Sequence, residues 1–267
     1  MVALRVAQLR RPSRARKTES YFSPARPRVF AHRGLALDAP ENTLLAFAKA
    51  IAVGVDYVET DVHASADGHS VIAHDADLKR IANRSVRVDQ LTLAELRRID
   101  LGFGQTFATL AEALDGFPDT RFNIDVKSAA AVAPTVAAVL AAAATNRVLV
   151  TSFDEGRRAA TVRGLPGVAS SASARLFLPA LVAGTLGFSP LVRHALRNVM
   201  AVQVPERALG LRVTSKRILR QLHDAGLEVH VWTVNDPTRM TELLDLGVDG
   251  IVTDRADVAL EVLRGRS

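Results

Sequence analysis

The feature of this sequence that most constrains its fold is a repeated pattern in which a short apolar run ends in charged residues. Between Val29 and Asp75 three such runs lead into His32, Glu59 and His74. In α/β proteins the functional side chains lie at the carboxyl ends of the strands, which is the pattern seen here. Two histidines, an arginine and two carboxylates placed in this way indicate phosphate ester chemistry assisted by a metal ion.

Strand-like and helix-like patterns alternate along the rest of the chain. We expect parallel strands at 29–31, 56–62, 121–127, 148–152, 168–171, 200–204, 228–234 and 250–253, and helices at 43–53, 92–99, 109–114, 130–144, 154–162, 215–225 and 237–246. The strand at 70–73 follows 56–62 too closely for a parallel crossover, so it should form an antiparallel hairpin.

Eight strand units in residues 29–267 predict an α/β fold, a (β/α)₈ TIM barrel with a small β-hairpin insertion after the second strand. The alternative is an open doubly wound sheet. Against that alternative, no strand is followed by the Gly-x-Gly-x-x-Gly turn that such nucleotide-binding sheets use.

The first 28 residues differ in charge from the rest of the chain. They carry eight Lys or Arg against one acid, Glu19, whereas residues 29–267 carry 26 basic and 27 acidic residues. Such a segment, broken by Pro24 and Pro27, is too charged to bury. We therefore expect a basic, disordered extension at 1–28 and one barrel domain at 29–267. Weak attraction of the extension to an anionic membrane or nucleic acid is the alternative role.

The sequence contains no cysteine, which excludes disulfides and thiolate catalysis. Residues 1–9 lack the apolar stretch and cleavage pattern of a signal peptide, so we expect a cytoplasmic protein. Segment 176–192 has no charge, but two prolines and two glycines make it too interrupted for a membrane-spanning helix. Two interpretations of this segment remain: a helix and loop packed on the barrel, or an apolar lid that contacts lipid.

Pairs of charged residues, two positions apart, occur on two neighbouring strands. Glu59 and Asp61 share one face of their strand, and Asp125 and Lys127 repeat this spacing on the next parallel strand. Three carboxylates that converge in a barrel mouth repel one another unless a cation is present or some are protonated. Oxygen ligands favour a hard ion, Mg²⁺ or Ca²⁺, over zinc. The alternative is a plain salt-bridge network around Lys127.

Two histidines at strand ends are candidates for proton transfer. His32 and His74, facing a carboxylate-lined mouth, can act as a general acid and a general base near neutral pH. Arg33 offers a forked donor set for the non-bridging oxygens of a phosphodiester. We expect no catalytic role for the other five histidines, among which His63 shares a strand face with Asp61.

These clusters resemble the signature blocks of the glycerophosphodiester phosphodiesterases, from Val29 to the end of the chain and in the family's order. The blocks are Ala31-His32-Arg33-Gly34, Pro40-Glu41-Asn42-Thr43, Val58-Glu59-Thr60-Asp61-Val62, Asp67-Gly68, His74-Asp75, Leu91-Thr92-Leu93-Ala94-Glu95-Leu96, Asn123-Ile124-Asp125-Val126-Lys127, Thr151-Ser152-Phe153, Val231-Trp232-Thr233-Val234-Asn235 and Gly247-Val248-Asp249-Gly250-Ile251-Val252-Thr253-Asp254. The resemblance implies a (β/α)₈ barrel with a hairpin-containing insertion after its second strand.

The resemblance also implies roles for nine residues. It makes His32 and His74 the acid–base pair, Arg33 a phosphate ligand, Lys127 the group that neutralises developing charge, Glu41 a hydrogen-bonding support, Trp232 a pocket wall against the glycerol or alcohol moiety, and Glu59, Asp61 and Asp125 the ligands of one divalent cation. A core-packing role is the alternative for Trp232. Many members of the family have glutamate at the position of Asp125, and the shorter side chain leaves a ligand position to water.

The implied reaction is metal-dependent hydrolysis of a small-molecule glycerophosphodiester to sn-glycerol 3-phosphate and an alcohol, in glycerol and lipid metabolism. One alternative is a lysophospholipase of D or C type that acts on lipid-linked diesters at a membrane surface, with contact through 1–28 or 176–192. Another is a barrel that binds without catalysis. No nucleic-acid partner is expected. The alcohol, the choice between Mg²⁺ and Ca²⁺, the attacking oxygen and the oligomeric state stay open at the level of sequence.

Overall fold

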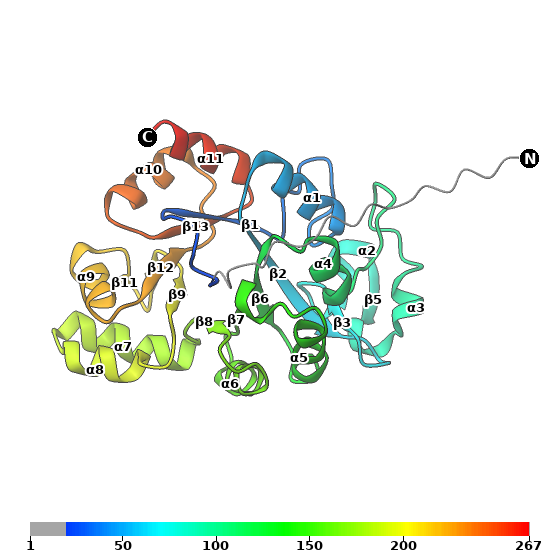
Figure 1. Cartoon of the computed structure of the whole chain (residues 1–267), viewed down its shortest axis with the longest axis horizontal. Helices are drawn as coiled ribbons and strands as arrows, with labels where there is room; N and C mark the ends of the chain where they lie inside the picture. Colours follow the sequence, from blue (N-terminus) through cyan, green and yellow to red (C-terminus); the bar gives the residue numbers. More distant parts are fainter. Residues whose placement is uncertain (1–19, 267) are drawn as a thin grey trace, which may run out of the picture.

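In the computed structural model, which describes residues 20–266, eight parallel strands form a barrel with helices around it (Figure 1). In spatial order the strands are β8 (Ala169–Ser170), β7 (Val148–Thr151), β6 (Arg121–Val126), β2 (Tyr57–Ala64), β1 (Arg28–His32), β13 (Gly250–Thr253), β12 (Glu228–Val231) and β9 (Ala201–Val204). A parallel bridge between Ser171 and Ala201 joins the two ends of this row and brings β8 next to β9. The predicted (β/α)₈ barrel is therefore confirmed, and the open sheet is excluded.

The barrel strands match the predicted segments closely. Each of the eight overlaps one of the segments expected from the sequence. The strand predicted at 228–234 ends three residues earlier, at Val231, and the next residue, Trp232, lines a cavity.

Helices cover the outside of the barrel (Figure 1). They are α1 (Leu44–Val53), α4 (Leu110–Gly116), α5 (Val132–Ala141), α6 (Glu155–Gly164), α7 (Ala174–Leu186), α8 (Ser189–Leu196), α9 (Lys216–Asp224), α10 (Pro237–Asp245) and α11 (Ala256–Arg264), with a short turn of 3₁₀ helix η2 (Thr145–Arg147) and a small hairpin of β10 (Arg207–Ala208) and β11 (Leu211–Arg212). The side chain of Thr43 accepts a hydrogen bond from the backbone of Ala46, which starts α1 as expected. None of the described helices is both long and apolar enough to cross a bilayer.

The insertion after the second strand begins with the predicted hairpin, in which β3 (Ser70–Ile72) pairs antiparallel with β2. It continues through β4 (Asp77–Leu78), α2 (Lys79–Ala82), β5 (Arg84–Arg87), η1 (Val88–Gln90) and α3 (Leu93–Leu96), which lie at one side of the barrel (Figure 1). A separate apolar cluster that includes Leu78, Val88, Leu96 and Phe107 holds it together. The insertion is thus a small subdomain, larger than the hairpin we expected.

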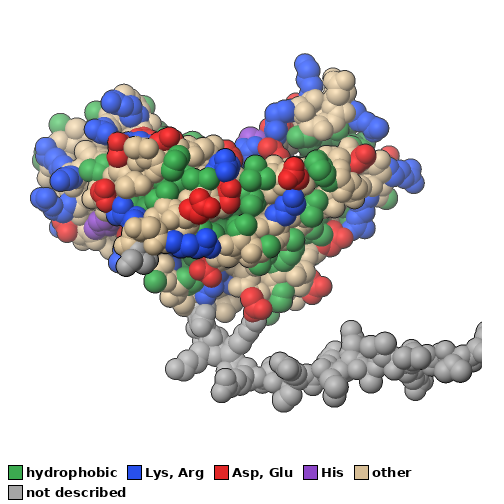
Figure 2. Space-filling view, turned by 90° about the horizontal axis from the view of Figure 1, so that it is seen from above, with side chains coloured by type: hydrophobic (Ala, Val, Ile, Leu, Met, Phe, Trp, Pro, Cys, Tyr) green, Lys and Arg blue, Asp and Glu red, His purple; other side chains and the backbone are tan. Residues whose placement is uncertain are grey.

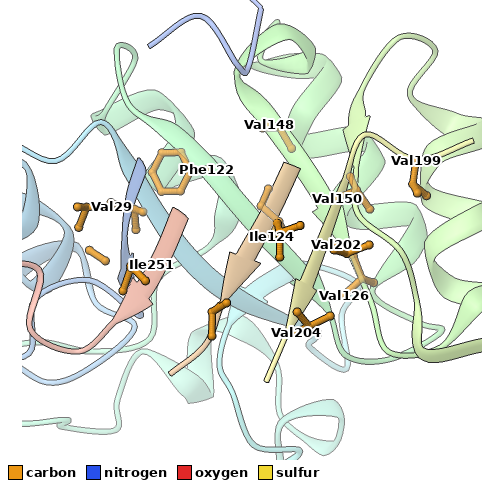
Figure 3. Close-up of a cluster of buried hydrophobic side chains, with 14 of the residues drawn as sticks. Val29, Phe122, Ile124, Val126, Val148, Val150, Val199, Val202, Val204 and Ile251 are labelled. Carbon is orange, nitrogen blue, oxygen red and sulfur yellow. The ribbon is translucent and has the colours of Figure 1, made fainter. Parts of the chain in front are cut away.

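The alternation of side chains along each strand separates an outer core from the barrel interior. Val29, Phe122, Ile124 and Val150 belong to the large apolar cluster in which barrel strands meet helices (Figure 3). The residues that alternate with them along the strands, such as Phe30, point to the other face and belong to a smaller cluster inside the barrel. This alternation determines which side chains can form a site, because it directs every second side chain of β1, β2 and β6 into the barrel.

Residues 20–28, which we expected to belong to the extension, instead close the amino-terminal end of the barrel. Tyr21 is 2% exposed, and its ring packs against the ring of Tyr57 with 5.2 Å between their centroids. The hydroxyl of Tyr57 donates to the carbonyl of Tyr21 at 2.9 Å, and Arg28 lies in β1 and bonds to Glu228. The prediction relied on charge and did not consider that Tyr21 could pack into the barrel. The domain therefore includes residues 20–28. Residues 1–19 of the predicted extension lie outside the described part of the chain.

Glu228 lies in a buried ionic cluster at this end of the barrel. It accepts hydrogen bonds from Arg28 at 2.7 Å and from His230 at 3.1 Å. Burial alone would raise the pKa of Glu228, but the bonds from Arg28 and His230 lower it to about 2, below the usual 4.5. A depressed carboxyl pKa contributes stability that is complete above the unfolded-state pKa and is lost as the pH falls from about 4.5 towards 2.

We therefore expect Glu228→Gln to reduce the free energy of unfolding at pH 7, with the deficit shrinking by about 1 kcal/mol at pH 3. Urea denaturation of both proteins at the two pH values measures this change. The control is Glu242→Gln, since Glu242 pairs with Arg239 but is 55% exposed. A Glu228→Gln deficit that is the same at both pH values would contradict the assignment.

Candidate active site

A cavity of about 360 Å³ opens at the carboxyl ends of the barrel strands. Eight of the nine predicted site residues line it: His32, Arg33, Glu59, Asp61, His74, Asp125, Lys127 and Trp232. Glu41, the ninth, lies behind Arg33 and bonds to it. In a space-filling view the outline of the molecule is indented between two lobes (Figure 2). Residues from six separate strand ends or loops therefore meet at one site, as the pattern of strand followed by charge predicted.

His32 is the last residue of β1, and a carboxylate fixes the orientation of its ring. Its Nδ1 lies 2.7 Å from an oxygen of Asp254, which in turn accepts a hydrogen bond from Asn235 at 2.8 Å. Its Nε2 lies 3.9 Å from Glu59. Burial lowers the pKa of His32, but the bond to Asp254 and the charge of Glu59 outweigh burial and raise it. A proton on Nδ1 directed at Asp254 leaves Nε2 to exchange a proton with a ligand.

His74 follows β3 and is oriented in the same way from the other side of the site. Its Nδ1 lies 2.7 Å from Asp75, whose second oxygen accepts a hydrogen bond from Arg80 at 2.6 Å. Burial opposes ionisation of Asp75, but the bonds from His74 and Arg80 lower its pKa. Two imidazoles, each held at Nδ1 by a carboxylate, are the arrangement that a general acid and a general base require.

Arg33 lies in a turn that only a glycine can follow. A Cβ at Gly34 would lie 2.7 Å from the backbone of Ala46, and Gly34 has a φ of +85°. The guanidinium of Arg33 donates to Glu41 at 3.0 Å, and its buried Nε lies 3.4 Å from Asp61 without making a hydrogen bond within the described chain. A buried donor on a cation that makes no hydrogen bond suits an anionic ligand such as a phosphodiester.

Glu41 connects the two sides of the site. One of its oxygens accepts hydrogen bonds from Arg33 at 3.0 Å and from Arg80 at 2.6 Å. Burial opposes ionisation of Glu41, but the two arginines lower its pKa. Glu41 is therefore an ionised support for Arg33, which is the geometry expected for a hydrogen-bonding role.

The three carboxylates converge as predicted, with Lys127 among them. The Nζ of Lys127 lies 2.8 Å from Asp61 and 2.7 Å from Asp125. Burial and repulsion by Asp61 raise the pKa of Glu59 to about 8, and burial raises that of Asp125. Burial opposes ionisation of Asp61 as well, but Lys127 and Asn42 hold its pKa low. The salt-bridge network that was the alternative is thus present, and it includes Arg33, whose Nε lies 3.4 Å from Asp61. Two cations, one of them shared with Glu41, still carry less charge than three ionised carboxylates.

The chemistry of this donor set fits a divalent cation, although the side chains do not already surround one point. Among residues 20–266 no three His, Cys, Asp or Glu side chains are arranged to hold a metal ion as they stand. Lys127 occupies the space between Asp61 and Asp125. Yet Oδ1 of Asp125 is buried without a hydrogen-bond partner, and an unpaired carboxylate oxygen is the type of atom that a hard cation takes as a ligand.

The opposite wall of the cavity is apolar. Trp232 and Phe153 pack edge to face at 5.9 Å, and Phe177 and Leu178 of α7 extend this wall. Trp232 also contacts the cluster inside the barrel, so it combines packing with a place in the cavity wall. The cavity therefore has one charged side and one apolar side.

Several residues near the site were missed by sequence reasoning. Asp254 orients His32, and Arg80 bonds to the Asp75 carboxylate that holds His74. Asn42 donates to Asp61 at 3.0 Å. A signal for Asp254 was available, because it directly follows β13 and has the inward parity of Val252. No local signal identifies Arg80, since its partners lie on other segments.

Comparison with known proteins agrees with the geometry. A model described as the glycerophosphoryl diester phosphodiesterase family matches residues 32–258. The chain is 43% identical over 240 residues to a protein of Mycobacterium tuberculosis described as probable glycerophosphodiester phosphodiesterase 2, covering 89% of this chain and 91% of that protein. It is 30% identical to a glycerophosphodiester phosphodiesterase of Caldanaerobacter subterraneus, covering 88% and 97%. A rat lysophospholipase D is 25% identical, with 94% and 90% covered.

Solved structures show the same architecture. A glycerophosphodiester phosphodiesterase from Agrobacterium tumefaciens matches with a TM-score of 0.73 at 26% identity, covering 89% of this chain and 99% of that one. A phosphodiesterase from Oleispira antarctica, solved in complex with the product sn-glycerol-3-phosphate, matches with a TM-score of 0.73 at 24% identity, covering 90% and 97%. At this identity the second match shows the fold alone.

Proposed function

Because the chain belongs to the glycerophosphoryl diester phosphodiesterase family, we propose that its cavity binds a glycerophosphodiester between Arg33 and Lys127 for proton transfer by His32 and His74. The protein is a phosphoric diester hydrolase that converts glycerophosphodiesters to sn-glycerol 3-phosphate and an alcohol. The observation that carries the proposed roles is the pair of imidazoles, each held at Nδ1 by a carboxylate and each lining the same cavity.

In this proposal the phosphate lies against the cationic side of the cavity. Arg33 provides a buried Nε that has no hydrogen-bond partner within residues 20–266, and Lys127 places a second cation on the same side. One histidine accepts a proton from the attacking oxygen, and the other donates a proton to the leaving alcohol. Glu41 keeps Arg33 in place, and the wall of Trp232 contacts the apolar part of the substrate.

Members of this family generally depend on a divalent metal ion. We assign the ion to Glu59, Asp61 and Asp125, because these three carboxylates carry more negative charge than Lys127 and Arg33 neutralise and because Oδ1 of Asp125 has no hydrogen-bond partner within residues 20–266. When bound, such an ion supplies Lewis-acid polarisation of the phosphate. Oxygen-only ligands favour Mg²⁺ or Ca²⁺. Arg33 and the two histidines act on the substrate at the edge of this carboxylate group.

The test is to identify the products from glycerophosphocholine in the presence of Mg²⁺ or Ca²⁺. We expect glycerol 3-phosphate and choline, quantified by a coupled glycerol 3-phosphate assay and by mass spectrometry. Release of glycerol and phosphocholine would overturn the assigned cleavage position. Absence of turnover with glycerophosphocholine, glycerophosphoethanolamine and glycerophosphoglycerol, with either ion, would overturn the substrate class.

The apolar wall favours a second candidate, a lysophospholipase D activity on diesters that carry an acyl chain. Phe153, Phe177 and Leu178 give the cavity an apolar lining that an acyl chain could contact. Lysophosphatidylcholine in the same assay distinguishes the two, because the acyl chain adds apolar contact only if the wall binds it. The cytoplasmic location and the lack of a nucleic-acid partner stay predictions from the sequence.

Asp254 orients His32, so replacing it should impair turnover more than binding. We expect Asp254→Asn to lower kcat about 10–100-fold with little change in KM, since an amide holds the ring less well. Asp257→Asn is the control, because Asp257 follows on the same segment but pairs with Arg255 away from the cavity. Steady-state kinetics on glycerophosphocholine measure both parameters. A rise in KM with kcat unchanged would show that Asp254 binds substrate instead.

A further inference from the structure

Helix α7 carries an unusual outer face. Its exposed positions Arg175, Pro179, Val182 and Leu186 follow the spacing of one helical face, and after Arg175 the larger residues of this face are apolar. The opposite face, with Phe177, packs against the body of the protein. A helix on the surface of a soluble domain ordinarily presents polar side chains outwards, so this apolar face calls for an explanation.

The apolar face continues through the turn into α8. Val182, Leu186, Phe188 and Leu191 are 43, 65, 54 and 55% exposed, so four large apolar side chains within ten residues lie in solvent. We call these four residues the apolar ridge. Glycine at 187, with a φ of +90°, makes the turn between the helices. Single exposed apolar residues are ordinary on a protein surface, but a contiguous group indicates an interaction site.

The surroundings of the apolar ridge are strongly basic. Residues 175–220 contain eight Lys or Arg and one acid, Glu206, whereas the rest of residues 29–267 contains 18 basic and 26 acidic residues. The cations are Arg175, Arg193, Arg197, Arg207, Arg212, Lys216, Arg217 and Arg220. Within residues 20–266 none of these eight forms an ion pair, and Glu206 is itself paired with Arg239. Arg175 acts electrostatically on Glu155, but the positive charge of this surface is otherwise uncompensated by ion pairs within the described residues.

Cations and ridge lie close together. On α8, Leu191, Arg193, His194 and Arg197 are all exposed, while Val192 and Leu196 are buried. From α9, the guanidinium of Arg217 lies 2.8 Å from the position that a Cβ would take at Gly187. Helices α7, α8 and α9 and the strand β11 lie together at one side of the barrel (Figure 1).

We propose that the apolar ridge and the cations around it form a docking surface for an anionic lipid bilayer. Apolar side chains insert at the boundary between headgroups and acyl chains, and cations next to them bind the anionic headgroups. The uncompensated charge favours this occupant over a second copy of the chain, because two copies would bring like charges together. Docking does not depend on the assignment of catalytic residues.

Docking at this surface would bring the active site close to lipid. The inner side of α7 lines the catalytic cavity with Phe177 and Leu178, and the ridge begins at Val182 on the same helix. From Leu178 to Leu186 is roughly 12 Å along the helix axis. A diester that resides in the bilayer would thus reach the cavity over a short path.

The test is sedimentation of the full chain with phosphatidylcholine vesicles that contain 0 or 30% phosphatidylglycerol, a composition on the order of that of anionic membranes. We expect binding to the anionic vesicles only. The charge variant Arg193→Gln/Arg197→Gln/Arg217→Gln should weaken it about 100-fold, as each cation contributes at the surface. The ridge variant Leu186→Ser/Phe188→Ser/Leu191→Ser should weaken it at least about 10-fold.

Matched controls separate the surface from charge in general. Arg84→Gln/Arg98→Gln/Arg163→Gln removes the same charge from exposed positions elsewhere, and Phe103→Ser/Leu140→Ser removes exposed apolar residues elsewhere. Both should bind like the unmodified chain. Every variant should hydrolyse glycerophosphocholine in solution at the unmodified rate, since none alters a catalytic residue. This rate distinguishes failure of docking from failure of the proposed function.

Three results would overturn the proposal. Equal binding by the unmodified chain and the charge and ridge variants would assign membrane attraction to the basic segment 1–19, which all variants retain. Absence of binding to anionic vesicles would exclude the surface as a lipid site. A dimer in sedimentation velocity that the ridge variant dissociates would show that a second copy covers the ridge.

Discussion

Replacing His32 by alanine is expected to lower kcat for glycerophosphocholine hydrolysis about 10²–10⁴-fold, and replacing His74 is expected to have an effect of similar size. Each ring is held at Nδ1 by a carboxylate, Asp254 or Asp75, and lines the cavity beside Arg33. The chemistry needs one group that accepts a proton and another that donates one. When either histidine is removed, water must carry out one of the two proton transfers. The two single replacements should therefore lower kcat to a similar extent.

The fold should survive both replacements. The side chains of His32 and His74 are 19 and 32% exposed and belong to none of the apolar clusters, so thermal unfolding midpoints should change little. Because the two groups act in one reaction, the double variant should be hardly slower than the worse single variant. His69→Ala, at an exposed position on the hairpin turn, is the matched control and should keep full activity.

The measurement is kcat and KM from initial rates, with circular dichroism melting to verify the fold. If both alanine variants keep activity within a few-fold of the unmodified enzyme, the acid–base assignment is wrong. If one variant is inactive and the other is not, a single residue carries out both proton transfers. Inactivity of the unmodified enzyme on all diesters would instead support a barrel that binds without catalysis.

The alternation of residues along the strands explains why so much of the site could be predicted. Phe30 and His32 are two apart, as are Glu59 and Asp61, so each pair shares a strand face. Once the strands are assigned, the inward faces of β1, β2 and β6 follow, and so does the meeting of charges at their carboxyl ends. The local pattern was sufficient because the alternation along a strand decides which side chains point into the barrel. In a closed barrel the inward side chains at the strand ends then meet at one site.

Features that depend on distant partners were not predictable in the same way. Tyr21 follows a strongly basic stretch, and its burial depends on Tyr57 across the barrel floor. Arg80 bonds to Glu41 and Asp75, which only the insertion brings together. The sequence predicted the strand at 70–73 and the helix at 92–99 of the insertion, but its other strands and helices are two to four residues long and leave almost no periodicity in the sequence.

Segment 176–192 shows the limit of a composition argument. Its prolines and glycines correctly exclude a spanning helix, yet Pro179 lies inside α7 and Pro190 lies in the first turn of α8. The structure is therefore a pair of helices, and not the helix and loop of the first interpretation. Which of its apolar residues are exposed depends on the faces that α7 and α8 turn to the barrel, and this requires tertiary structure.

Removal of divalent metal is the second change with a large expected effect. Chelation should reduce activity about 10²–10⁴-fold, because polarisation of the phosphate is lost, and Mg²⁺ or Ca²⁺ should restore it. Activity should be followed by glycerol 3-phosphate release, with residual metal determined by elemental analysis. Full turnover by protein shown to be free of divalent metal would contradict metal dependence.

Glu59→Gln tests where the ion binds without relying on activity. Glutamine has the shape of glutamate without its charge, and three carboxylates face two cations, Lys127 and Arg33. Burial and repulsion by Asp61 already raise the pKa of Glu59, so the ion-free variant should unfold at or above the midpoint of the ion-free unmodified protein. Addition of Mg²⁺ or Ca²⁺ should raise the midpoint of the unmodified protein, because an ion that binds only the folded state stabilises it by mass action.

The same addition should raise the midpoint of Glu59→Gln much less, since one ligand charge is missing. Glu155→Gln is the control, because Glu155 bonds to Arg158 and Ser173 on the outside of the barrel and should leave the ion effect intact. Equal stabilisation of Glu59→Gln and the unmodified protein by the ion would place the ion elsewhere. The carboxylates around Lys127 would then be the salt-bridge network alone, and their charge imbalance would have to be relieved by protonation.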